Sequence, residues 1–289
     1  MNEVQSGYFS HDSSTKQLFS ESFDLKPFLF RHQLHTHKLL SVPALGQLAK
    51  KMAREEKPRG FFRLSNESRG LEWGSPEFRK ALDEAFGEIE TSQMRLKLSS
   101  IQSESEYAEV LANCSYELSD LTSVDLSRAY RDPKATIFIS SPNEITPYHV
   151  DEEANFLLQI YGTKIIHIFD GNDRELLEWR ELEEYYRCGN IRLREDFQSR
   201  GVCFDLEPGI GIHNPVNFPH WVQNGPGVSV SLSLGYTRAK NPVDVLQVNH
   251  YLRKVGFAPT PPGKIKSLDG AKRAIARGAR SIKKVLRHS

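Results

Sequence analysis

Apolar positions recur at helical spacing in the first part of the chain. Two stretches there begin with a serine closely followed by proline, at Ser41-Val42-Pro43 and Ser75-Pro76. A serine side chain caps the free amides at a helix start, and proline fits the first turn because it has no amide hydrogen to satisfy. The pattern therefore predicts mainly helices between Ser41 and Thr122, with a third helix at about Glu106 to Leu118.

From Thr136 onward the pattern changes to that of strands. Short runs rich in β-branched and aromatic residues are separated by Gly, Pro, Asp and Asn: Thr136–Ile139, Ile165–Phe169, Val202–Leu206 and Val228–Leu234. The last run alternates strictly between small polar and apolar residues, as a strand between two different environments does. A charged segment from Asp173 to Arg187 is expected to form a helix across the sheet. These features predict a mainly β barrel or sandwich with flanking helices.

A third pattern follows the strands. Val243 to Val255 has helical spacing, a Pro- and Gly-rich break follows, and the chain ends in a basic helix. The apolar residues that fall on one side of this last helix are Ala271, Ile275, Ala279, Ile282 and Leu286. We therefore expect a largely helical region at 1–130 that packs on the barrel, a β core at 131–240, and a helical region with a basic tail at 241–289.

Composition suits a globular protein, since 38% of the 289 residues are hydrophobic and 26% are charged. The net charge is +1, but its distribution is uneven. Nine Lys and Arg and one acid lie between Lys264 and Ser289, so this tail has a net charge of +8 and the rest of the chain has a net charge of −7 (1 − 8). Cys114, Cys188 and Cys203 show no C-x-x-C spacing, which argues against a disulfide framework or a zinc knuckle. No apolar run approaches the ~18 residues of a membrane span, and no export signal is visible. A cytoplasmic location is expected.

His149 and Asp151 are the first candidates for chemistry. Residues two apart on a strand point to the same face, so the imidazole and the carboxylate can converge on one point. A second imidazole would complete the two-His-one-carboxylate triad, which leaves one face of an octahedral iron open. His220 and His213 compete for that role, and the offset from Gly209 favours His220. The alternative is a surface turn with a capping aspartate.

Polar residues around the pair suggest a second ligand. Thr146, Asn155 and Lys164 could place a hydroxyl, an amide and an ammonium around one pocket. A buried lysine needs an anionic partner, which a dicarboxylate co-substrate would supply. If Lys164 faces the pocket, His167 faces away from it because it has the opposite strand parity. A separate cluster of His32, His35 and His37 has spacing that could bind zinc, but a polar loop is the simpler interpretation.

The stretch Thr146–Lys164 resembles the core motif of the Jumonji-C family, the cupin-like 2-oxoglutarate oxygenases. Its pattern is closest to the asparaginyl hydroxylase that inhibits hypoxia-inducible factor, and Gly209–Tyr236 resembles that family more loosely. The resemblance implies a double-stranded β-helix (jelly-roll, cupin-like) core. It also implies roles for single residues. Fe(II) would be held by His149, Asp151 and His220, and the co-substrate 2-oxoglutarate would be held by Lys164 and Thr146. Asn155 and Ser233 would lie beside the iron and the co-substrate.

The chain departs from the family pattern at three places. Ile210 follows Gly209 where the family usually has an acid, and Asn217-Phe218-Pro219 replaces an aromatic-rich approach to the distal histidine. Ser233 stands where the hypoxia-type enzyme has Asn. These differences keep the triad intact but argue against transferring that enzyme's protein substrate.

The resemblance implies an oxygenase, specifically a hydroxylase, that couples 2-oxoglutarate decarboxylation to C–H oxidation with dioxygen. The substrate could be a protein side chain, a peptide or a small molecule. A non-catalytic cupin-like ligand sensor, or a regulator that binds nucleic acid through the basic tail, is the main alternative. A cupin isomerase or dioxygenase without 2-oxoglutarate would leave Lys164 unexplained. The basic helix could instead be solvated, bind nucleic acid or an acidic membrane, or form a homodimer through the C-terminal helices.

Overall fold

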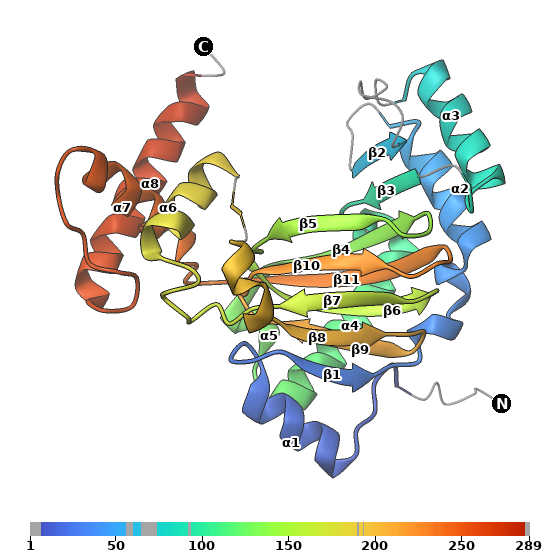
Figure 1. Cartoon of the computed structure of the whole chain (residues 1–289), viewed down its shortest axis with the longest axis horizontal. Helices are drawn as coiled ribbons and strands as arrows, with labels where there is room; N and C mark the ends of the chain where they lie inside the picture. Colours follow the sequence, from blue (N-terminus) through green and yellow to red (C-terminus); the bar gives the residue numbers. More distant parts are fainter. Residues whose placement is uncertain are drawn as a thin grey trace.

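Two antiparallel sheets face each other in the computed structural model, which describes residues 7–55, 60–64, 74–91, 94–189, 191–192 and 194–286 (Figure 1). The strands are β1 (Phe28–Arg31), β2 (Gly60–Leu64), β3 (Met94–Leu98), β4 (Tyr130–Ser140), β5 (Ile145–His149), β6 (Glu153–Tyr161), β7 (Lys164–Ile168), β8 (Val202–Leu206), β9 (Ile210–Asn214), β10 (His220–Asn224) and β11 (Ser229–Arg238). The larger sheet has the order β1-β9-β6-β11-β4-β3-β2 and the smaller β5-β10-β7-β8. This is the expected double-stranded β-helix.

Helices flank the sheets on two sides. They are α1 (Ser13–Ser22), α2 (Val42–Met52), α3 (Pro76–Gly87), α4 (Ser105–Thr122), α5 (Leu126–Ala129), α6 (Trp179–Cys188), α7 (Val243–Lys254) and α8 (Lys266–Leu286), with short 3-10 turns η1 (Leu34–Thr36), η2 (Lys38–Leu40), η3 (Ile101–Ser103) and η4 (Glu195–Arg200). Among the described residues, no helix combines the length and apolarity needed to cross a membrane.

The predicted helix starts are confirmed. The Ser41 hydroxyl accepts a hydrogen bond from the amide of Ala44, and the Ser75 hydroxyl accepts one from Phe78 at 3.0 Å. However, β2 and β3 lie in the region where the pattern predicts mainly helices. Each is only five residues long: β3 pairs with β4, and β2 pairs with β3 at the edge of the larger sheet. A strand this short has too few positions for its period to stand out among helical segments.

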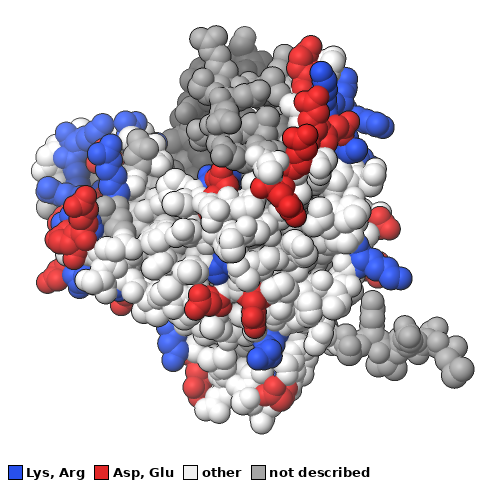
Figure 2. All heavy atoms as spheres, turned by 45° about the vertical axis from the view of Figure 1, so that its right-hand side comes forward, with Lys and Arg blue, Asp and Glu red and all other residues white. Residues whose placement is uncertain are grey.

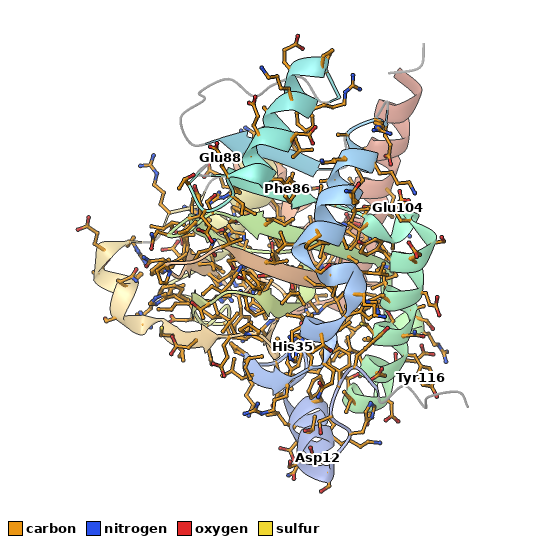
Figure 3. All side chains as sticks on the ribbon, turned by 90° about the vertical axis from the view of Figure 1, so that its right-hand side faces the viewer. Asp12, His35, Phe86, Glu88, Glu104 and Tyr116 are labelled. Atoms are coloured by element: carbon orange, nitrogen blue, oxygen red, sulfur yellow. The ribbon has the colours of Figure 1, made fainter. Side chains whose placement is uncertain are left out.

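The main apolar core lies between the larger sheet and the N-terminal helices (Figure 3). The face of the larger sheet that is turned away from the smaller sheet contributes residues such as Phe156, Ile137 and Leu232. They are fully buried in this core together with Leu118 of α4. Burial of each such side chain contributes about 1.5–3 kcal/mol. Because neighbouring strand residues point to opposite faces, Asn155 and Leu157 beside Phe156 are turned into the space between the two sheets.

Helices α6, α7 and α8 form a lobe beside one end of the sheets (Figure 1). In α8 the buried positions are Asp269, Lys272 and Ala276, whereas Ala271, Ile275 and Ala279 are exposed. The side chains of Ile282 and Leu286 lie outside the described residues. The apolar side predicted for this helix is therefore turned toward solvent over its described part.

Candidate metal centre

His149, Asp151 and His220 come together at one end of the space between the sheets. Their ligand atoms all lie within 4.8 Å of one another. Nε2 of His149 is 3.9 Å from one carboxylate oxygen of Asp151, and Nε2 of His220 is 3.7 Å from the other. Strand pairing explains the convergence, since His220 lies directly opposite His149 where β10 pairs with β5. Among the described residues this is the one such group of His, Cys, Asp and Glu.

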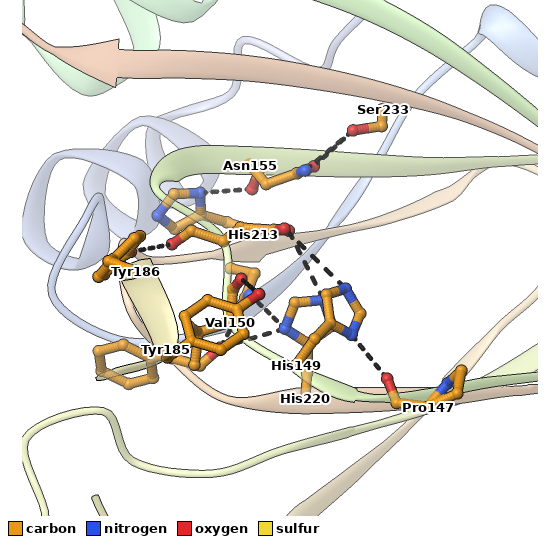
Figure 4. A network of polar contacts seen from close by, with 12 residues as sticks. Pro147, His149, Val150, Asn155, Tyr185, Tyr186, His213, His220 and Ser233 are labelled. Carbon is orange, nitrogen blue, oxygen red and sulfur yellow. Dashed lines mark hydrogen bonds and ion pairs between the residues drawn. The ribbon is translucent and has the colours of Figure 1, made fainter. Parts of the chain in front are cut away.

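Both imidazoles are oriented to present Nε2 to a cation (Figure 4). Nδ1 of His149 lies 2.7 Å from the carbonyl oxygen of Pro147, and Nδ1 of His220 lies 3.1 Å from that of Phe218. A carbonyl can only accept, so Nδ1 of His149 carries the proton and its Nε2 keeps its lone pair. Nδ1 of His220 also lies 3.1 Å from the side-chain amide nitrogen of Asn214, and its Nε2 is the ring nitrogen turned toward Asp151. Metal-binding histidines are commonly held by such an outer hydrogen bond.

Burial favours the neutral form of His220. Desolvation, followed by the nearby His149, lowers the pKa of its imidazole to about 4. A neutral imidazole is the form that ligates a metal. The side chains of His149 and Asp151 remain about 30% exposed, so the pair is open to solvent on one side. Two imidazoles and one carboxylate on one side, with space on the other, fit an iron that needs open positions for exchangeable ligands.

The turn that carries Asp151 is supported by α6. The hydroxyl of Tyr185 donates to the carbonyl of Val150 at 2.7 Å, and the hydroxyl of Tyr186 donates to the carbonyl of Asp151 (Figure 4). The backbone amide of Asn217 donates to the same Asp151 carbonyl at 3.0 Å. These contacts hold the carboxylate in place without using its oxygen atoms.

The competing histidines lie elsewhere. His213 is fully buried on the other face of the larger sheet, where its ring packs against Phe23, Phe28 and Phe156. His167 is on the outer face of the smaller sheet and stacks on Trp221 with ring centroids 4.0 Å apart, as its strand parity predicts.

The N-terminal histidines do not converge on a common point. His32 is buried, with burial as the main cause that lowers its pKa to about 3, and Nδ1 of His37 accepts from the amide of Leu39.

Lys164 is turned into the space between the sheets. It lies opposite Asn224 of β10, and its neighbours on that face of β7, Ile166 and Ile168, belong to the buried cluster between the sheets. The residue is 7% exposed, and its side chain takes part in no ion pair or hydrogen bond with the described residues. Desolvation, followed by the charge of Arg95, lowers the pKa of its ammonium to about 7. An anion bound here would offset the free energy lost when the ammonium is desolvated.

The other predicted co-substrate residues share this interior. Thr146 lies opposite Val222, which is buried between the sheets, and so faces the same way as Lys164. Asn155 and Ser233 are joined to each other, with the amide donating to the hydroxyl at 2.9 Å (Figure 4). The structure therefore brings Thr146, Lys164, Asn155 and Ser233 to the inner faces of the two sheets that hold the triad.

Some residues of the site were not found from the sequence. The amide of Asn214 lies 3.1 Å from Nδ1 of His220. Gln159 is fully buried inside, where its side-chain amide donates to the hydroxyl of Ser229 and accepts from that of Ser231. The alternating serines of β11 were the available signal for such a polar lining, because each needs a partner when buried.

A cavity of about 930 Å³ also reaches Lys164. Its lining includes Asn224, Leu206 and Arg31, but none of the three metal-site residues. We assign the site from the convergence of ligand atoms rather than from this cavity, because three oriented donors are the more specific signal.

Two facing antiparallel sheets define a double-stranded β-helix, with a His-Asp-His cluster between the sheets. No family model and no curated protein sequence matches the chain. Two solved structures share its fold. An X-ray structure of E. coli ycfD is 12% identical with a TM-score of 0.51, over 93% of this chain and 68% of that one. A crystal structure of the Escherichia coli ribosomal oxygenase YcfD is 12% identical with a TM-score of 0.50, over 93% and 66%. At this identity the likeness shows the fold, and that fold with its triad is consistent with an Fe(II)/2-oxoglutarate oxygenase.

Proposed function

We propose that this protein is an Fe(II)- and 2-oxoglutarate-dependent oxygenase that hydroxylates its substrate. In the overall reaction one oxygen atom of O2 enters a substrate C–H bond as hydroxyl. The other enters succinate as 2-oxoglutarate loses CO2, so the electrons for reducing dioxygen come from both substrates. His149, Asp151 and His220 would hold the iron, which when bound supplies the redox chemistry that activates dioxygen.

The protein's own residues bind and orient the reactants. Lys164 would pair with the distal carboxylate of 2-oxoglutarate, and the Thr146 hydroxyl would donate to the same group. Asn155 and Ser233 present a polar surface on the opposite sheet. The apolar residues Ile166, Ile168 and Val222 exclude water from the space between these anchors.

One observation carries the proposal: Lys164 is only 7% exposed and its side chain has no anionic partner among the described residues, on the sheet that also holds the two histidines. Burying an unpaired charge is costly, so its position implies a ligand that brings an anion. A metal-dependent isomerase that binds no 2-oxoglutarate would leave the buried Lys164 unexplained. A ligand sensor that does no chemistry would leave the orientation of the two Nε2 atoms unexplained.

An anaerobic titration tests the assignment. Protein loaded with Fe(II) is titrated with 2-oxoglutarate, and the visible charge-transfer absorption of the chelated 2-oxoacid is followed. We expect saturable absorption in the wild type and none in Asp151→Ala or His220→Ala. On admission of air, succinate should form in the wild type and in neither of these two variants.

His167→Ala is the matched control, because this histidine lies on a neighbouring strand of the same sheet but faces outward. It should retain both absorption and succinate formation. If the wild type binds Fe(II) but not 2-oxoglutarate, the protein is a metal-dependent cupin of another kind. If it binds neither, the oxygenase assignment is wrong.

A further inference from the structure

Helix α8 packs on α7 through polar residues. The carboxylate of Asp269 accepts the amide of Gly263 at 2.7 Å, and Nζ of Lys272 donates to the carbonyl of Thr260 at 2.9 Å. That carbonyl also accepts from the side-chain amide of Asn249 in α7. These hydrogen bonds fix the rotation of α8 about its own axis, because Asp269, Lys272 and Ala276 share one face.

The rotation leaves the apolar side of α8 in solvent. Leu268 is 44% exposed and Ile275 is 61% exposed, with the exposed Ala271 between them at helical spacing. The same lobe exposes further large apolar side chains: Tyr251 at 59%, Val255 at 70%, Phe257 at 66% and Ile265 at 39%. A helix that serves only as a solvated cover would turn Leu268 and Ile275 inward and its charges outward.

The exposed charges of this C-terminal segment are positive. Lys264, Lys266 and Arg277 are exposed, whereas Asp269, the only acid from Lys264 to the end of the chain, is buried. Figure 2 shows Lys and Arg gathered over the lobe of the C-terminal helices, with acidic side chains at its lower edge. The tail segment carries +8 and the rest of the protein −7, so an acidic surface would attract this lobe and repel the body.

We propose that α8 is a membrane-surface helix that holds the protein on an anionic lipid bilayer. The exposed side chains of Leu268 and Ile275 would enter the boundary between headgroups and acyl chains, and the net positive charge of the segment would draw the helix to the lipid phosphates. With 21 residues, the helix is long enough to lie along the bilayer surface over several turns.

Two other binding partners fit the exposed side of α8 less well. A nucleic acid would use the basic residues alone and leave Leu268 and Ile275 in water, since phosphate contacts are electrostatic. A second copy of α8 would cover the apolar side but bring two segments of charge +8 together. An anionic bilayer matches both the apolar and the basic side of the helix.

Cosedimentation of the full-length protein with lipid vesicles tests the proposal. We expect binding to vesicles that contain phosphatidylglycerol in phosphatidylcholine, and no binding to phosphatidylcholine alone. The double variant Leu268→Gln, Ile275→Gln should lose at least about tenfold in vesicle affinity, because two apolar side chains no longer leave water. Since both side chains are exposed, circular dichroism and Fe(II) binding should be unchanged.

Tyr116→Gln provides the matched control, since Tyr116 is 80% exposed on α4 (Figure 3) and should not affect vesicle binding. Three results would overturn the proposal. The wild type could fail to bind the anionic vesicles, or the double variant could bind them as well as the wild type does. Finally, sedimentation equilibrium without lipid could show a dimer that the double variant splits, which would assign the apolar side to a second copy.

Discussion

At the scale of single residues, Lys164 is a side chain whose burial opposes folding. Its lowered pKa reflects the desolvation of an ammonium that has no anionic partner in the part of the chain that the structure describes. Replacing it with methionine, Lys164→Met, keeps the length of the side chain and removes the charge. We expect this variant, free of metal and co-substrate, to unfold at higher urea concentration, with about 1–4 kcal/mol of added stability.

The same substitution should weaken 2-oxoglutarate binding by about 100-fold or more, because loss of one partner of a buried charged pair costs roughly 2–5 kcal/mol. Fe(II) affinity should stay near the wild-type value. A structural lysine would behave in the opposite way, with lower stability and unchanged co-substrate binding. Urea denaturation and the anaerobic titration separate the two outcomes.

The pKa of Lys164 also sets a pH dependence for co-substrate binding. In the free protein its pKa is lowered to about 7, and an anion bound beside the ammonium raises it again. Binding therefore takes up a proton above about pH 7, and affinity should fall by up to about tenfold per pH unit between roughly pH 7 and 9. Calorimetry at pH 8 in two buffers of different ionisation enthalpy measures that uptake. Uptake that persists in Lys164→Met would assign the proton to another group.

At the scale of elements, the turn between β6 and β7 connects the strand that follows Asp151 to the strand that begins with Lys164. Gly162 in this turn has a φ of +68°, and a Cβ built there would lie 1.9 Å from the carbonyl oxygen of Val228. Gly162→Ala should therefore destabilise the protein by about 2–4 kcal/mol, through the left-handed backbone and the clash together. Gly227→Ala, where nothing lies within 4 Å, should be close to neutral. Equal urea midpoints for the two variants would contradict this account.

Much of the β core could be predicted because its signals are local. The runs that became β7, β8 and β11 show their period within a few residues, and the His149–Asp151 spacing needs only strand geometry. The choice of His220 over His213 depends on which face of a sheet each occupies. That is decided by the pairing of β10 with β5 and of β9 with β1 and β6, between residues far apart in the chain. Asn214 and Tyr186 were missed for the same reason.

At the scale of the whole molecule, α6 connects the metal centre to the C-terminal lobe. Its tyrosines hold the carbonyls of Val150 and Asp151, while on its other side it packs on α7. The link to α7 is an ion pair in which Nε of Arg253 donates to Glu183 at 2.7 Å, and Glu183 is 1% exposed. The fold around the metal therefore depends on a contact in a different part of the chain.

Removal of the Glu183 carboxylate tests whether the metal centre depends on this ion pair. Glu183→Ala leaves the guanidinium of Arg253 without its partner. Because the Arg253 side chain is 24% exposed, the loss in stability should be smaller than the about 3–5 kcal/mol of a fully buried pair. We expect faster proteolysis of the C-terminal helices and weaker Fe(II) binding, because an undocked α6 no longer supports the Asp151 turn. Glu184→Ala, at the exposed neighbouring position, should change neither. The apolar pair Glu183→Leu, Arg253→Met should restore part of both properties, since it removes the uncompensated charge. If Fe(II) binding stays at the wild-type level while the lobe is proteolysed, α6 is not the connection between the lobe and the metal.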